Sequence, residues 1–316
     1  MSQRNVSPDT VKSYRDTFRI FIMHLETAHA VKPSTITIKH LEAEYIIGFL
    51  NYLEEGRGNK PKTINARLSA IGSFLKFLSF ELPEYSGLLS RSLMIPYRIE
   101  AKKEMDFLTK EEYQALLDAC DPRSVLGRRD QLMLMILYNT GVRVSELLGL
   151  SMQDIITDAS GLSSFIHVYG KGRKERDVPI WKSTAAFLRK YMGSCDDDNS
   201  TRLFINRTDG ELTRSGVRYR INCLVKKTVI FLPSLSRKTV SPHTFRHTVA
   251  LNLLQSGVDI STIAIWLGHE SILTTHKYMV ADLEMKRRTL AKVQEPEGVT
   301  YNYRPSSAIL AFLDSL

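Results

Sequence analysis

The stretch SPHTFRHTVALNLLQSGVDISTIAIWLGHESILTTHKYM, residues 241–279, decides how the chain is interpreted. Within it lie His243, Arg246, His269 and Tyr278. A guanidinium can bind two phosphate oxygens at once, and an imidazole donates hydrogen bonds or moves protons near neutral pH. A tyrosine hydroxyl becomes a usable nucleophile only where its surroundings favour the phenolate. The segment therefore predicts a tyrosine nucleophile aimed at a phosphate.

The length and charge of the chain indicate how many domains it has and what kind of partner it binds. The chain has 316 residues, enough for two domains, and its 43 Lys and Arg against 34 Asp and Glu give a net charge of +9. This excess favours a polyanionic partner, nucleic acid ahead of a membrane surface, although ordinary solubility would also explain it. Three widely spaced cysteines (Cys120, Cys195 and Cys223) predict no disulfide or zinc site. With no apolar leader segment, we expect a cytoplasmic, nucleoid-associated protein.

The N-terminal part reads as helices. Apolar residues recur at helical spacing over residues 11–25, 41–54 and 61–78. Four basic residues lie on the opposite face of the third segment: Lys60, Lys62, Arg67 and Lys76. They fit either a stripe that faces phosphate or a solvated helix face. We predict a helical domain over residues 1–98.

Helical periodicity weakens from Glu81 to Phe107, where prolines and the charged run EAKKE predict a linker over residues 99–106. The segment Thr109–Glu112 is a capping box that starts a helix of a second domain, residues 107–295. This domain reads as mostly helical, with two strands, Ser163–Tyr169 and Arg176–Ile180. A tail, residues 296–316, starts extended and ends in an apolar helical pattern.

A second motif, NTGVRVSE at residues 139–146, lies between two predicted helices. Gly141 permits a sharp turn that leaves Arg143 in the first turn of the next helix. A cation there opposes the helix dipole unless an anion docks at the same place. Glu146, one turn later, would hold the guanidinium. A surface arginine with a carboxylate partner also explains the motif taken alone.

Lys171 stands at the tip of the predicted hairpin, between two glycines that let the backbone approach a ligand closely. Most hairpin-tip lysines are merely solvated, and Lys174 in the basic run RKER competes for the same role.

The pair His243 and His247, four residues apart, has the spacing of a zinc peptidase. That pattern needs a glutamate after the first histidine, and Thr244 stands there instead. We therefore expect no metal, and we interpret His247 as a histidine packed within its helix. Tyr278, taken alone, fits an amphipathic core position equally well.

Taken in order, Arg143, Lys171, His243, Arg246, His269 and Tyr278 resemble the catalytic set of the tyrosine recombinase (integrase) family. The stretches that carry this resemblance are TGVRVSELLGL, GKGRKERDVPI, HTFRH and LGHESILTTHKY. It covers essentially the whole chain. One departure is Phe245, where the family often has an aliphatic residue, and this concerns packing. The resemblance implies a mainly α fold, with an N-terminal SAM-like domain that binds core-type DNA. It also implies a helix-rich catalytic domain with a small antiparallel sheet.

The resemblance also implies a mechanism. Tyr278 attacks a DNA phosphodiester, forms a 3′-phosphotyrosyl link and releases a 5′-hydroxyl. Arg143 and Arg246 neutralise the non-bridging oxygens, and His269 adds a hydrogen bond to the phosphate. Lys171 acts as the acid for the departing oxygen, and His243 accepts the proton of Tyr278. Such a site needs no metal, cofactor or ATP.

Members of this family work as tetramers on two DNA duplexes, through a Holliday junction. The apolar stripe of the tail would dock on a neighbouring protomer or pack within its own chain: Ile309, Leu310, Phe312, Leu313 and Leu316. We expect integration, excision or transposition of a mobile element, with a second recombinase or a directionality factor as conceivable partners. The alternatives are a Xer-type dimer resolvase, a type IB topoisomerase and a catalytically silent DNA-binding accessory protein.

Overall fold

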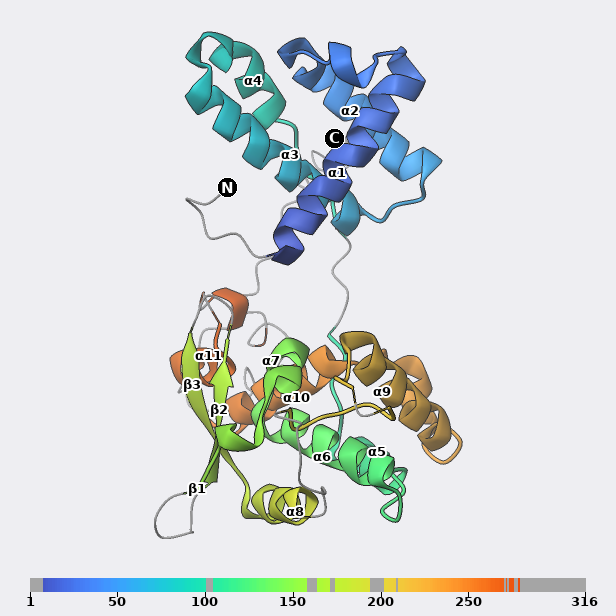
Figure 1. The fold of residues 1–316 in the computed structure, drawn as a ribbon, viewed down its shortest axis with the longest axis vertical. Coiled ribbons are helices and arrows are strands. Elements are labelled where there is room, and N and C mark those ends of the chain that lie inside the picture. Colours follow the sequence, from blue (N-terminus) through green and yellow to red (C-terminus); the bar gives the residue numbers. More distant parts are fainter. Residues whose placement is uncertain are drawn as a thin grey trace, which may run out of the picture. The chain divides into compact units, whose positions relative to one another are not determined.

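The computed structural model describes residues 8–100, 105–157, 164–170, 174–193, 202–208, 210–269, 271, 273–275 and 278. The chain divides into two compact units, Met1–Lys103 and Glu104–Leu316 (Figure 1). Lys171 and the C-terminal tail lie outside the described residues. None of the described helices is long and apolar enough to cross a membrane.

The first unit is helical, as the periodicity predicts. Its α-helices are α1 (Pro8–His29), α2 (Ala43–Asn51), α3 (Pro61–Glu81) and α4 (Ser86–Leu93). Proline opens both α1 and α3, where its missing N–H is not needed. The helix α2 continues into a π-helical turn, Tyr52–Gly56. The core brings together fully buried side chains of all four helices, among them Leu25, Phe49, Ile71 and Leu89.

The weak periodicity after Glu81 does not predict α4, and in this respect the sequence interpretation is wrong. Pro83 begins a 3₁₀ turn that leads directly into the helix instead of opening a linker. In α4 the side chain of Leu89 is fully buried. The hydroxyl of Ser92 donates to the carbonyl of Leu41 at 2.8 Å. An eight-residue helix offers too few turns for a periodic signal, yet its burial completes the core.

The basic stripe of α3 is only partly free for a ligand. Lys60, Lys62 and Lys76 are exposed. Arg67 instead pairs with Asp16 of α1, at 3.4 Å between Nη2 and Oδ2. One of the four cations therefore joins two helices of its own unit.

The second unit places helices around α6, which runs through its centre (Figure 1). Its described α-helices are α5 (Lys110–Asp118), α6 (Val125–Thr140), α7 (Val144–Gly149), α8 (Lys182–Met192), α9 (Arg214–Thr228), α10 (Pro242–Gln255) and α11 (Ile260–Leu267). The capping box at the start of α5 is confirmed. The hydroxyl of Thr109 accepts from the N–H of Glu112, and the Glu112 carboxylate accepts from the N–H of Thr109.

A three-stranded antiparallel sheet lies beside these helices, in the order β1 (Ile155–Thr157), β2 (Ser164–Tyr169) and β3 (Glu175–Ile180). The sequence predicts β2 and β3, but β1 is too short for an alternating pattern. Ile166 pairs with Val178 and Val168 with Arg176. The two valines and Ile166 are almost completely buried, so the face that holds Arg176 is the inner one.

Candidate active site

The candidate site is assembled where the ends of three helices meet. Gly141 ends α6 in the left-handed conformation, with φ 64°. A Cβ at this position would lie 2.7 Å from Cδ2 of Leu267, so the glycine allows the end of α6 to approach the end of α11. The next residue but one, Arg143, is the N-cap of α7.

Arg143 is held by its own helix and by the end of α11. Its Nη1 donates to Oε1 of Glu146 at 2.8 Å, as the sequence motif predicts, and its backbone N–H donates to Oε2 at 2.9 Å. Its Nη2 donates to the carbonyl of Gly268 at 2.8 Å. Burial alone would raise the pKa of Glu146, but hydrogen bonds from Arg176 and Arg143 keep that pKa below its ordinary value. The carboxylate therefore stays charged and fixes the guanidinium.

Arg246, on α10, is only 4% exposed. Its Nη1 donates to the carbonyl of Gly141 at 2.7 Å, and its Nη2 donates to the carbonyl of Leu267 at 2.5 Å. Burial, together with the charge of Arg143, lowers the pKa of Arg246 to about 10. The side chain is still protonated at neutral pH, and the two guanidiniums form one cationic centre.

His269 follows directly on Gly268, which ends α11 in the left-handed conformation with φ 63°. The Nδ1 of His269 lies 2.7 Å from the hydroxyl of Thr275. Its ring lies nearly parallel to that of Tyr278, with centroids 6.4 Å apart. The turn after α11 thus sets the imidazole beside the candidate nucleophile.

Tyr278 is 2% exposed and packs in an apolar cluster with residues of α10 and α11. Burial raises the pKa of Tyr278, and the charges of Arg246 and Arg143 act against that rise. The phenol is therefore neutral in this conformation. Its activation requires a proton acceptor and the nearby cations.

A second imidazole contacts the phenol, and it is not one that the sequence assigned to the site. The Nδ1 of His247 lies 3.0 Å from the hydroxyl of Tyr278. His247, interpreted from the sequence as a histidine packed within its helix, thus also contacts the candidate nucleophile. His243 is exposed one turn earlier on α10, with its ring centroid 6.4 Å from that of His247. The i,i+4 spacing that raised the question of zinc instead places both histidines on the face of α10 that reaches Tyr278.

Lys171 lies outside the described residues, but both ends of its hairpin are described. The N–H of Gly170 donates to the carbonyl of Lys174 at 2.7 Å. A Cβ added to Gly170 would lie 3.5 Å from Oε1 of Glu146. The hairpin therefore starts beside the carboxylate that holds Arg143. No group of three or more potential metal ligands occurs among the described side chains.

Comparison with known proteins shows the family of the chain. The model of the phage integrase family matches residues 106–285, and the phage integrase N-terminal SAM-like domain matches residues 1–81. The chain belongs to the phage integrase family of tyrosine recombinases. It is a site-specific DNA recombinase, an enzyme that breaks and rejoins DNA.

Curated relatives of the recombinase include putative integrases and Xer recombinases. It is 40% identical over 316 residues to "Putative integrase/recombinase y4rC" of Sinorhizobium fredii, covering 100% of this chain and 94% of that protein. It is 31% identical over 296 residues to tyrosine recombinase XerD of Listeria monocytogenes, covering 90% and 92% of the two chains.

Solved structures show the same fold. The XerH recombinase bound to a palindromic difH substrate, in a post-cleavage complex, superposes with a TM-score of 0.70 at 20% identity, covering 92% of this chain and 81% of that one. The Tn1549 transposon integrase with a circular intermediate DNA gives a TM-score of 0.70 at 18% identity, covering 92% and 96%.

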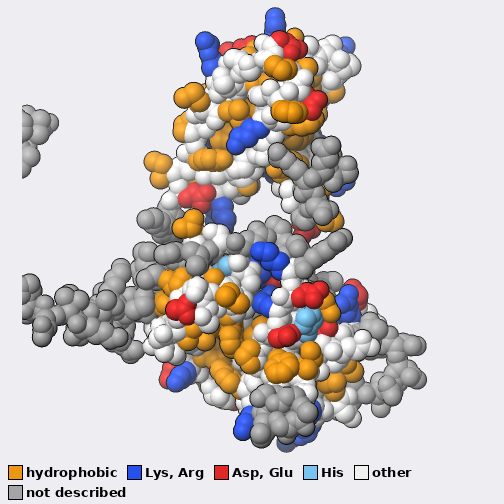
Figure 2. All heavy atoms as spheres, turned by 90° about the vertical axis from the view of Figure 1, so that its left-hand side faces the viewer, with side chains coloured by type: hydrophobic (Ala, Val, Ile, Leu, Met, Phe, Trp, Pro, Cys, Tyr) orange, Lys and Arg blue, Asp and Glu red, His pale blue; other side chains and the backbone are white. Residues whose placement is uncertain are grey.

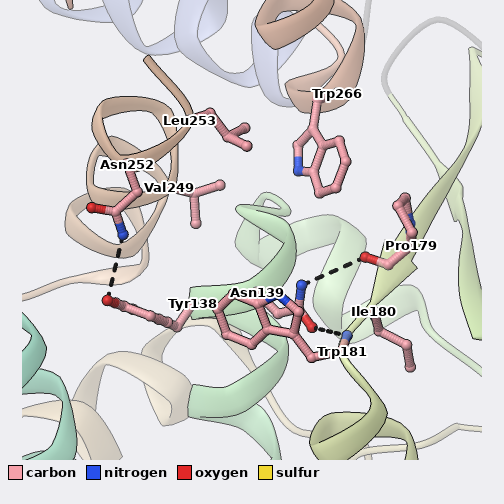
Figure 3. Close-up of a pocket in the computed structure, with 9 residues that line it drawn as sticks. All are labelled: Tyr138, Asn139, Pro179, Ile180, Trp181, Val249, Asn252, Leu253 and Trp266. Atoms are coloured by element: carbon pink, nitrogen blue, oxygen red, sulfur yellow. Dashed lines mark hydrogen bonds between the residues drawn. The ribbon is translucent and has the colours of Figure 1, made fainter. Parts of the chain in front are cut away.

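A pocket of about 200 Å³ adjoins the candidate site, between α6, β3, α10 and α11 (Figure 3). Trp181, Leu253 and Trp266 are among its mainly apolar lining. The indole N–H of Trp266 donates to the carbonyl of Thr140 at 3.2 Å, which ties the pocket wall to the last turn of α6. On one face of this unit, apolar side chains lie next to a group of charged and histidine side chains (Figure 2).

Proposed function

We propose that the recombinase cleaves DNA through Tyr278 and rejoins it by way of a 3′-phosphotyrosyl intermediate and a Holliday junction. The convergence of the Arg143 and Arg246 guanidiniums on the turn that carries His269, beside Tyr278, is the observation that carries this proposal. Two fixed cations and an imidazole next to a phenol suit the transfer of a phosphoryl group to a tyrosine.

In the proposed step, Tyr278 Oη forms a bond to phosphorus and the bond from phosphorus to the 5′-oxygen breaks. The proton of the phenol passes to an imidazole, and Lys171 supplies a proton to the departing oxygen. Arg143, Arg246 and His269 stabilise the charge that builds up on the non-bridging oxygens. One phosphate ester replaces another, so the reverse step can join a new strand without an energy source.

His247 is well placed to accept the proton. Its Nδ1 lies within hydrogen-bond distance of the phenol, at 3.0 Å. His243, to which the resemblance gives this role, is the other candidate on the same helix. The hydrogen bond to the phenol supports His247 as the base, and we propose that His243 contacts the substrate.

Replacing His247 by glutamine tests this assignment. We expect the rate of DNA cleavage to fall by about 100- to 10,000-fold, the usual contribution of a general base. Raising the pH should recover part of the rate, because hydroxide then deprotonates Tyr278. His243→Gln is the matched control, and its rate should not recover at high pH. Cleavage by His247→Gln at the wild-type rate, with alkaline recovery confined to His243→Gln, would reverse the assignment.

The polarity of the covalent link provides the test of the proposed function. The DNA that is trapped covalently on the protein should first be sequenced, which identifies the recombination site. A nicked duplex of that site should then be labelled at either end. We expect the 5′-end label of the cleaved strand to migrate with the protein on a denaturing gel, and the 3′-end label to be released. An adduct that retains the 3′-end label would contradict a 3′-phosphotyrosyl intermediate.

We propose a mobile element as the source of that site. The identity to the y4rC protein, 40% over the whole chain, exceeds the 31% to XerD of Listeria monocytogenes, which favours an integrase over a dimer resolvase. Trapped DNA from the two ends of an element would support this role. Trapped DNA from one chromosomal locus, shared by related strains without the element, would favour the Xer-type alternative. Relaxation of any supercoiled plasmid would indicate a topoisomerase.

The assembly is proposed to be a tetramer on two duplexes, joined by the tail. Residues 296–316 are proposed to form the docking segment, which lies outside the described residues. The apolar pocket bounded by Trp181 and Trp266 supports this proposal, because Trp181 leaves 53% of its surface exposed at the rim. An apolar helix end is the kind of segment that such a pocket accepts.

A further inference from the structure

The C-terminal end of α11 is capped by three arginines from distant parts of the chain. A helix leaves its last carbonyls without partners inside the helix, and its C-terminus carries partial negative charge that favours cations. The three bonds run from Arg176 Nε to the carbonyl of Trp266 (2.9 Å), from Arg246 Nη2 to that of Leu267 (2.5 Å) and from Arg143 Nη2 to that of Gly268 (2.8 Å). Two of these arginines belong to the proposed catalytic set, and the third does not.

Arg176 also donates hydrogen bonds to the carboxylate of Glu146, which holds Arg143. Its Nη2 donates to Oε2 of Glu146 at 2.8 Å, and its Nη1 donates to Oε1 at 3.3 Å. The side chains of Arg176 and Glu146 are 11% and 2% exposed, so water scarcely competes for these bonds. One buried carboxylate thus fixes two guanidiniums, one from β3 and one from the start of α7.

The contact between Arg176 and the turn after α11 leaves no spare room. A Cβ added to Gly268 would lie 2.8 Å from Nη1 of Arg176. The glycine therefore serves both the left-handed turn and the close approach of the guanidinium. His269 is the next residue, so the same contact determines where its backbone emerges.

We propose that Arg176 is a positioning residue for DNA cleavage. It binds both the turn of residues 266–268 and Glu146, and it thereby orients Arg143 and His269 toward the scissile phosphate. This inference rests on the proposed function of that site. Lysine cannot take over the role, because the geometry needs one donor for a carbonyl and a planar pair for a carboxylate. The basic run that contains Arg176 therefore includes one arginine that faces inward and does not contact DNA.

The variants Arg176→Gln and Arg176→Lys test the proposal on a duplex that carries the recombination site. We expect both to bind DNA within about twofold of the wild type, because the buried guanidinium neutralises no phosphate. Cleavage should slow on the order of 100-fold, the effect of a misplaced catalytic group. Arg202→Gln is the matched control. Arg202 caps a carbonyl at the end of α7, that of Gly149, and pairs with Glu211, and neither of these partners belongs to the site.

Two modified substrates separate positioning from other roles. A methylphosphonate at the scissile position removes one anionic oxygen and so reduces the demand on the arginines. A 5′-bridging phosphorothiolate has a leaving group that needs no acid, and so it bypasses Lys171. We expect the defect of the Arg176 variants to shrink on the methylphosphonate and to persist on the phosphorothiolate.

Each other result overturns the inference. A defect that disappears on the phosphorothiolate means that Arg176 acts through the hairpin of Lys171. An equal defect on both substrates, with a matching loss of DNA binding or thermal stability, means a purely structural role. Cleavage by a folded Arg176→Lys variant at the wild-type rate also overturns it, and this variant decides the case if Arg176→Gln does not fold. Failure of the wild type to form any adduct would instead contradict the proposed function itself.

Discussion

Replacing Tyr278 by phenylalanine should abolish covalent protein–DNA adducts completely while leaving DNA binding within about twofold of the wild type. The change removes one hydroxyl and keeps a ring that is 2% exposed in its apolar cluster. The lost hydrogen bond to His247 should change the free energy of unfolding by about 1 kcal/mol. Denaturing gels measure the adducts, a binding assay on the same DNA measures the affinity, and chemical denaturation measures the free energy of unfolding.

Tyr191→Phe is the matched control, since Tyr191 lies in α8 and is equally buried, at 3% exposed. This variant should form adducts at the wild-type level. Persistent adducts with Tyr278→Phe would mean that another residue is the nucleophile. Loss of adducts in both variants would point to a general effect on folding. An accessory protein without catalysis would form none in the wild type either.

Much of the candidate site could be predicted because most of its residues lie in short local sequence motifs. Arg143 with Glu146 lies in one turn of helix, and the spacing from His269 to Tyr278 lies in one segment. The structure brings these residues and Arg246 together. His247 was missed because a histidine within an apolar helix carries no signal of its own. Its contact with Tyr278, 31 positions later, depends on tertiary structure that no local pattern records.

Arg176 shows what sequence patterns leave out. Alternation along β3 places it on the same face as Val178 and Ile180, which are buried, so an inward direction could have been predicted. The partners of Arg176 could not be predicted from the sequence. The carbonyl of Trp266 is 90 positions away along the chain and offers no side-chain signal. In the same way, α4 and β1 are too short for periodicity, and only tertiary packing stabilises them.

Replacing Arg246 by methionine should separate catalysis from stability. The pKa of Arg246 is lowered to about 10, chiefly by burial, so the folded protein holds this charge at a cost of about 3 kcal/mol. Methionine removes that cost, but it leaves the carbonyls of Gly141 and Leu267 without a donor, at about 1–3 kcal/mol each. These two effects oppose each other, so the free energy of unfolding should change by no more than about 3 kcal/mol. Cleavage has no such compensation, and it should fall by about 100- to 1,000-fold or more.

Arg129→Met provides the opposite case. Arg129 is also buried, and it pairs with Asp130 at 2.6 Å near the start of α6, at the other end of this helix from Gly141. Its loss leaves a buried carboxylate that, among the described residues, pairs only with Arg220, so the free energy of unfolding should drop by about 3–5 kcal/mol. The folded fraction should nevertheless cleave DNA at the wild-type rate. Chemical denaturation and single-turnover cleavage of both variants measure the two effects. If Arg246→Met loses activity only in proportion to its stability, Arg246 supports the fold and does not act on the phosphate.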